Sequence, residues 1–275
     1  DNKKVVKQYL SYNNAVENKV KINWNAYQPV KPNFTGVQVF QNFDLADLRK
    51  YIDWKPFFIA WEMHGNFPAI LQDEIVGVEA TKLYNDANNL LDTIIAEKWL
   101  TAKGAVGFWE ASSKGDDVII HHGGEKTELH FLRQQSKKAA GQPNFSLADF
   151  ICPATENKKD YLGAFAVTIH GIEKHIKVFE DNQDDYNKII LQALADRLAE
   201  AFAEYLHAQT RRELWGYAKD EQLGNDELIK ENYVGIRPAP GYPACPDHTE
   251  KYTLFNLLEA EKHTGITLTE SLAMY

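Results

Sequence analysis

One arginine lies within a loop that contains four prolines and two glycines. Residues 231–251 read ENYVGIRPAPGYPACPDHTEK, and Arg237 directly precedes Pro238. Each proline fixes its φ angle, so the loop loses little conformational entropy when a ligand orders it. The guanidinium of Arg237 has five N–H donors in a planar fork that matches a carboxylate or a phosphate. The loop is a candidate edge of a small-ligand site. The plainer alternative is a rigid surface loop whose arginine pairs with a neighbouring carboxylate.

A row of acidic residues is the second candidate for ligand binding. Asp196, Glu200 and Glu204 recur every four residues in an apolar-periodic segment. This spacing places them on one helix face, where like charges repel by roughly 0.2–0.5 kcal/mol per pair. A cationic ligand or partner would relieve the repulsion. The alternative is a solvated face whose charge is balanced by Lys188 and Arg197.

Other polar residues give weaker signals. Asp53 precedes an apolar run, where it is either a helix cap or an acceptor for a ligand amine or hydroxyl. Cys245 and His248 could form a nucleophile pair, but nothing in the sequence would align the histidine. His121, His122 and His130 have no carboxylate at metal-ligand spacing, and no glycine-rich phosphate loop occurs.

Composition excludes several classes of protein. The 275 residues are 44% hydrophobic and carry a net charge of −9 without a block of basic residues, which argues against nucleic-acid binding. No apolar run has membrane-spanning length, so we expect no membrane partner. Cys152 and Cys245 show no disulfide or metal pattern, which is typical of reduced thiols in a cytoplasmic protein.

The elements that must position these residues mix helices and strands. Apolar periodicity predicts long helices over residues 70–99 and 184–214 and a further helix over 247–265. Asp247 and Glu250 have capping-box spacing at the start of that last helix. Shorter helices are predicted after Asp44 and over residues 225–233, whereas residues 53–65 could form a strand or a short helix.

Strand signals indicate an antiparallel sheet. Residues 104–112 and 116–122 flank a glycine-containing turn, as in a hairpin, and residues 127–132 could form a third strand. Residues 160–170 are apolar at nearly every position, which predicts a strand that is buried on both faces. Residues 1–44 read as a linker helix followed by an irregular segment. Without a regular βαβ repeat, the fold class is α+β.

The proline-rich loop resembles the signature of a known family. GIRPAPGYPACPDHTEK is similar to the activation, or reactivation, domain of cobalamin-dependent methionine synthase. LRKYIDWKPFFIAW, LQDEIVGVEATKLYNDANNLLD, DDYNKIILQALADRLAEAFAEYLH and EKHTGITLTESLAMY resemble the same domain in the same order. We therefore assign residues 1–36 to a linker or N-terminal extension and residues 37–275 to the activation domain.

The resemblance implies both a fold and a function. It implies a C-shaped single α+β domain with a bent antiparallel sheet and flanking helices. It implies binding of S-adenosylmethionine (AdoMet), whose methyl group remethylates cobalamin after flavodoxin or a similar reductase has reduced the inactive cob(II)alamin. Cobalamin would be bound by a partner domain of the same polypeptide. The whole enzyme would be the methyltetrahydrofolate–homocysteine methyltransferase, and this chain alone would have no turnover.

The resemblance also implies roles for individual residues. Arg237 would hold the AdoMet carboxylate, and Asp53 would accept from an amine or hydroxyl of the ligand. Glu200 and Glu231 match acidic positions near the family's site. Further residues of the loop would complete the site, namely Ala239 and Gly241 through the backbone facing the adenine, and Tyr242 near the corrin.

One difference from the family leaves an alternative function open. The resemblance implies a chain that continues past Tyr275 into a tail whose Tyr-Tyr pair contributes to the AdoMet site. We expect a domain that is C-terminally truncated relative to the family. The alternative is a docking module that caps the cobalamin domain and recruits flavodoxin, with a degraded ligand site.

Overall fold

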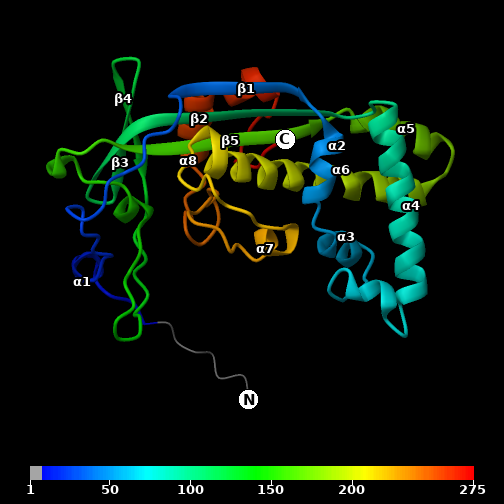
Figure 1. Ribbon diagram of the computed structural model, residues 1–275, viewed down its shortest axis with the longest axis horizontal. Helices are drawn as coiled ribbons and strands as arrows, with labels where there is room; N and C mark the ends of the chain where they lie inside the picture. The colour runs from blue at the N-terminus through cyan, green and yellow to red at the C-terminus, as the bar shows by residue number, and fades with distance from the viewer. Residues whose placement is uncertain (1–7) are drawn as a thin grey trace.

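An antiparallel sheet of five strands runs along one side of an open, C-shaped molecule (Figure 1). The computed structural model describes residues 8–275. The strands are β1 (Gly36–Phe43), β2 (Thr101–Lys114), β3 (Asp117–His122), β4 (Glu125–His130) and β5 (Asp160–His170). At one end of the C, α1 and the segment that follows β4 descend while the β3–β4 hairpin points upward, and α3 and α4 descend at the other end (Figure 1). The mixture of helices with an open antiparallel sheet confirms the α+β class.

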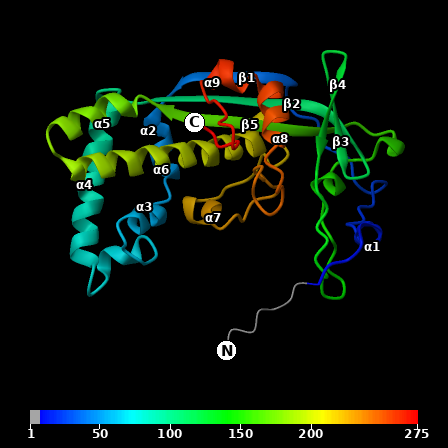
Figure 2. The same cartoon turned by 180° about the vertical axis from the view of Figure 1, so that it is seen from behind.

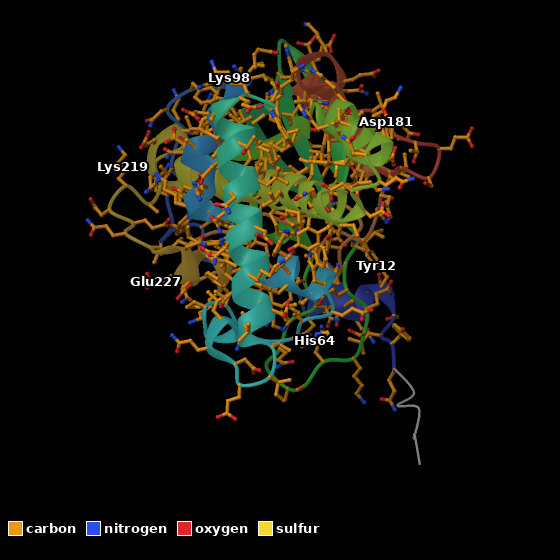
Figure 3. The ribbon with its side chains drawn as sticks, turned by 90° about the vertical axis from the view of Figure 1, so that its right-hand side faces the viewer. Tyr12, His64, Lys98, Asp181, Lys219 and Glu227 are labelled. Atoms are coloured by element: carbon orange, nitrogen blue, oxygen red, sulfur yellow. The ribbon has the colours of Figure 1, made fainter. Side chains whose placement is uncertain are left out.

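Nine α-helices occur in the described part of the chain. They are α1 (Tyr12–Glu17), α2 (Leu45–Leu48), α3 (Lys55–Ala60), α4 (Gly77–Ala96), α5 (Ile172–Asp181), α6 (Asp185–Gln209), α7 (Asn225–Ile229), α8 (Glu250–Leu258) and α9 (Ala260–Thr264). Figure 3 shows α4 along one side of the molecule, with Lys98 near one end and His64 near the other. Of the helices in residues 8–275, none is both apolar enough and long enough to span a bilayer.

Strand β2 is the centre of the sheet. It pairs with β5 along residues 101–111, and on its other edge it pairs first with β1 and then with β3. Most side chains of β2 are buried, whereas most of those on β5 are only half-buried. The prediction that residues 160–170 are buried on both faces is therefore wrong. Among the described strands, β5 pairs only with β2, so it lies at an edge of the sheet.

Alternate residues of β2 enter two separate hydrophobic cores, because successive side chains of a strand point to opposite faces. Ala102 and Val106 belong to the core formed with α4 and α6. Trp109 and Ala111 belong to a second core that includes residues of α8 and α9. Figure 2 shows α8 and α9 lying against the sheet, with α6 below it. This sheet–helix packing holds α6 in one position relative to the C-terminal helices.

Several helices and strands confirm the sequence predictions. The long helix predicted over residues 184–214 corresponds to α6, and the hairpin and third strand correspond to β2, β3 and β4. The ambiguous segment 53–65 contains α3, with a proline in the first turn, where its missing N–H costs no hydrogen bond. Asp44 caps α2 as predicted, since its carboxylate accepts from Ala46 N at 2.9 Å.

Other predictions need correction. Residues 36–43, expected to be irregular, form β1, because their backbone completes the edge of β2. The helix predicted over 247–265 is two helices, separated at Glu259 by a left-handed φ of 46°. Glu250 does not form a capping box; it accepts from His130 N on β4 at 3.0 Å. Helix α5 was not predicted at all.

The packing of Phe202 makes a first prediction. This fully buried side chain on α6 lies 5.0 Å from Phe43 of β1, ring centre to ring centre. Phe202→Ala should lower the free energy of unfolding by about 3–5 kcal/mol, because it removes apolar burial and leaves a cavity. Urea denaturation measures this loss. Tyr252→Ala, at a half-exposed position on α8, is the control and should change stability by less than about 0.5 kcal/mol. A loss near zero for Phe202→Ala would contradict the packing described here.

Candidate functional site

An ion pair joins the proline-rich loop to α6. Arg237 Nη2 donates to Glu204 Oε2 at 2.7 Å. The side chains are only 26% and 10% exposed, respectively. The loop that carries Arg237 connects α7 to α8 and lies below α6, on the inner side of the C (Figure 1). This contact confirms the alternative that Arg237 pairs with a neighbouring carboxylate.

The pair leaves hydrogen-bonding capacity unused. Arg237 Nε and Glu204 Oε1 are both buried, and within residues 8–275 neither has a hydrogen-bond partner. Burial raises the pKa of the Glu204 carboxyl, although the nearby Arg237 and Arg211 oppose this effect. Burial is the largest single effect and works against the charge of Arg237, but Glu204, Tyr233 and Glu200 together outweigh it, so the pKa of Arg237 is raised. The ion pair is therefore made by one hydrogen bond, and each of the two side chains keeps a further polar atom that is buried without a partner.

A second buried ion pair supports the start of the loop. Arg211 is fully buried and donates to both carboxylate oxygens of Glu221, at 2.7 and 2.8 Å. Its Nη1 also lies 2.7 Å from His207 Nδ1, and its guanidinium lies over the ring of Tyr233, 4.1 Å from the ring centre. A π-helical turn at Thr210–Leu214 follows α6 at this point. Such turns are frequent at functional sites.

His207 is neutral in this cluster. Burial, and then the charges of Arg211 and Arg237, lower its pKa to about 3. A neutral imidazole can accept from Arg211 at Nδ1, whereas a protonated one would place two positive groups in contact. The ring of Tyr233 packs edge-on against His207, with centroids 4.9 Å apart. The cluster thus holds the residues just before Arg237.

Backbone hydrogen bonds within the loop fix the conformation of its remaining residues. Gly241 N donates to Cys245 O at 2.7 Å, and Cys245 N donates to Tyr242 O at 2.9 Å. Gly241 has a φ of +100°, and a Cβ there would lie 2.2 Å from the His248 ring, so only glycine fits. Ala239 is exposed, and the Tyr242 side chain is 68% exposed. The loop presents these residues on the surface.

Cys245 and His248 do not form a nucleophile pair. Cys245 is buried, and this burial raises the pKa of its thiol to about 11. His248 Nδ1 instead lies 3.3 Å from Lys251 Nζ. A reactive cysteine needs an accessible thiolate, so the structure contradicts this alternative.

The remaining candidate residues lie in three different places, namely Asp53 before α3, Glu231 after α7 and Glu200 on α6. Asp53 accepts from Lys55 N at 3.0 Å, so it caps the start of α3, and the adjacent Ile52 carbonyl accepts from Asn225 Nδ2 of α7 at 3.1 Å. Glu231 follows α7 in a left-handed conformation with a φ of 55°. It is exposed and contributes to the raised pKa of Glu204.

One of the three acidic residues on the predicted helix face contacts Arg237. Glu200 is exposed and acts on Arg237 only through its charge, whereas Glu204, one turn further along α6, makes the hydrogen bond. The four-residue spacing indicated both Glu200 and Glu204 as candidates but did not show which of them contacts Arg237. The Arg211 cluster was also missed. A signal was present, because His207 and Arg211 are four residues apart, a spacing that brings two side chains together on one helix face.

A surface hollow lies at the other end of the loop. It has a volume of about 430 Å³, and its walls include Tyr9, Leu132, Gln134, Pro243 and Pro246. Neither Arg237 nor Glu204 lines it. The hollow joins the N-terminal segment to the loop and was not expected from the sequence.

Comparisons with known proteins support one family. Residues 44–275 match the family model described as the activation domain of vitamin B12 dependent methionine synthase. A crystal structure of the MetH reactivation domain bound to AdoHcy is similar to this chain, with a TM-score of 0.92 and 51% sequence identity. The match covers 97% of this chain and 83% of that chain. These findings confirm the resemblance indicated by the motifs.

The buried His207 predicts a pH dependence of stability. The unfolded chain binds a proton at this residue below a pH of about 6.5, but the folded chain binds it only near a pH of about 3. Its contribution to the free energy of unfolding therefore falls as the pH falls through this window. His207→Gln retains an acceptor for Arg211 and removes the titration. Between pH 7 and about 4.5, the variant should lose on the order of 2 kcal/mol less stability than the wild type.

Urea denaturation at several pH values measures this difference. His64→Gln changes an exposed histidine outside the cluster (Figure 3) and should retain the slope of the wild type. Equal slopes for His207→Gln and the wild type would show that His207 is not held neutral.

Proposed function

Because the chain belongs to the family of activation domains of vitamin B12 dependent methionine synthase, we propose that it binds AdoMet and presents its methyl group for the remethylation of inactive cobalamin. The observation that carries this proposal is the likeness to a reactivation domain bound to AdoHcy, S-adenosylhomocysteine. AdoHcy is AdoMet without the transferred methyl group. A site that holds one shares most of its contacts with the other.

The charges around Arg237 fit such a ligand. The amino-acid end of AdoMet carries a carboxylate and an ammonium, and its sulfur is a cationic sulfonium. In the proposal, Arg237 binds the carboxylate, since a guanidinium fork matches that group. Asp53, Glu200 and Glu231 supply the acidic side for the cationic groups. Glu231 and Glu200 are exposed, so both remain accessible to a ligand.

The proline-rich loop would hold the other parts of the ligand. Ala239 and Gly241 are exposed and offer backbone groups to the adenine. The exposed side chain of Tyr242 is the part of the loop that we place near the corrin in the assembled enzyme. The internal hydrogen bonds of the loop keep these groups in place before binding, which lowers the entropy cost of ordering them.

The chain's own contribution is binding and orientation. When bound, AdoMet supplies an electrophilic methyl group for transfer to the reduced cobalt of cobalamin, which leaves AdoHcy. We place cobalamin on a partner domain of the same polypeptide, and assign the supply of the electron to flavodoxin or a similar reductase. The whole enzyme would then be the cytoplasmic methyltransferase that forms methionine. The chain alone would bind ligand without turnover.

Arg237→Ala tests the central contact of this site. The variant should bind AdoMet about 10–150-fold more weakly, because it loses a charge-assisted contact to the carboxylate. Isothermal titration calorimetry measures both affinities. Lys159→Ala, which removes an exposed cation paired with Glu110 at 2.8 Å, is the control and should bind as the wild type does. Equal affinities for Arg237→Ala and the wild type would remove Arg237 from the site.

A melting experiment separates ligand binding from the alternative of a docking module. AdoMet at about 100 times its dissociation constant should stabilise the folded chain by about 2.7 kcal/mol and raise its melting temperature. The same titration with adenosine controls for weak binding of the nucleoside alone. If millimolar AdoMet leaves the melting temperature unchanged, the domain serves docking to the cobalamin domain and flavodoxin instead.

A further inference from the structure

We propose that Glu204 is a positioning residue for ligand binding: it holds one edge of the Arg237 guanidinium so that the other edge faces the ligand carboxylate. This inference rests on the proposed function. It assigns a role to a residue outside the acidic positions that the family resemblance suggested.

The atoms of the ion pair divide the guanidinium into two edges. Nη2 of Arg237 donates to Glu204 Oε2 at 2.7 Å. The neighbouring donor Nε and the second acceptor Oε1 are both buried and, within the described chain, both without partners. Glu204 therefore holds the guanidinium through Nη2, whereas no hydrogen bond or ion pair of Nη1 occurs within the described chain. In the proposal, the ligand carboxylate approaches from the side of Nη1.

The same chain contains a guanidinium that already uses both edges. Arg133 donates from Nε and Nη2 to Asp116, and from Nη1 and Nη2 to Asp149. Its two carboxylates show that one buried arginine can satisfy two anions in this fold. Among residues 8–275, Arg237 forms an ion pair with Glu204 alone. The second position corresponds to the place that a ligand carboxylate would take.

Glu204 is suited to fix the arginine because it lies on a rigid element. Phe202 and Leu206, which flank Glu204 on α6, are buried in the hydrophobic core, and Glu204 itself is 7% exposed. An arginine side chain has many rotamers, and holding it beforehand removes an entropy cost from ligand binding. Arg211 and Tyr233 steady the backbone just before Arg237 in the same way.

The negative charge of Glu204 could also oppose the ligand carboxylate, so the two effects must be weighed. Glu204 would repel that carboxylate but attract the ammonium of the same amino-acid group. AdoHcy carries both charges and no net charge, so the two electrostatic effects largely cancel. The main effect of Glu204 on ligand binding is then the positioning of the Arg237 guanidinium. Removal of Glu204 should therefore weaken binding and not strengthen it.

The test compares two ligands and three variants by calorimetry. AdoHcy carries the amino-acid group, whereas methylthioadenosine keeps the adenosine and thioether but has no carboxylate. For Glu204→Ala, AdoHcy should bind at least about tenfold more weakly, since the charge-assisted contact that holds Arg237 is lost. Glu204→Gln should lose only about threefold, because its amide oxygen still accepts from Nη2. Both variants should bind methylthioadenosine with the affinity of the wild type.

Asp185→Asn is the matched control, since Asp185 is an exposed acidic residue in the first turn of the same helix, outside the row of candidate residues. It should bind both ligands as the wild type does. Melting curves verify folding, and if Glu204→Ala does not fold, Glu204→Gln decides the question by the same ligand comparison. An equal loss for both ligands would indicate general damage and overturn the proposal, as would unchanged or tighter AdoHcy binding. If the wild type itself does not bind AdoHcy, the proposed function fails first.

Discussion

The contact between Arg237 and Glu204 is the interaction on which the site depends. Two charges that lose most of their hydration are tolerated only when they are paired, because an unpaired charge in the same place would cost several kcal/mol. The ion pair therefore dictates where the proline-rich loop lies on α6. The Arg211–Glu221 pair beside it applies the same constraint to the residues before the loop. Buried pairs of this kind contribute more to a unique arrangement than to net stability.

The sheet connects the region of this ion pair to the rest of the molecule. Strand β2 is buried on both faces, so it joins the core under α6 to the core under α8 and α9. The loop between α7 and α8 is consequently anchored at its C-terminal end by α8, which packs against β2 in the second core. The C shape leaves the loop on its inner side (Figure 1), where a second domain could approach without displacing a core residue. In the proposed function, ligand binding and domain docking use adjacent parts of this one loop.

Local patterns in the sequence predicted the elements that depend on local physics. Three examples are the apolar periodicity of α6, the turn between β2 and β3, and the helix cap at Asp44. Each follows from residues within a few positions of one another. The failures share the opposite property. Residues 36–43 become a strand only because β2 offers a free edge. Glu250 leaves its predicted capping role because a distant backbone N–H, that of His130, lies within reach.

The sequence by itself determined the family, the fold class and the presence of a stiff cationic loop and of a row of acidic residues. Those properties depend on residue types and spacing, which are visible without coordinates. Only the tertiary structure decided which carboxylate meets Arg237. Glu200 and Glu204 share the same helical face, and the choice depends on where the loop crosses α6 and how deeply each residue is buried. The spacing of residues along the sequence does not reveal where the loop crosses α6, because that position is set by the packing of two segments that are far apart in sequence.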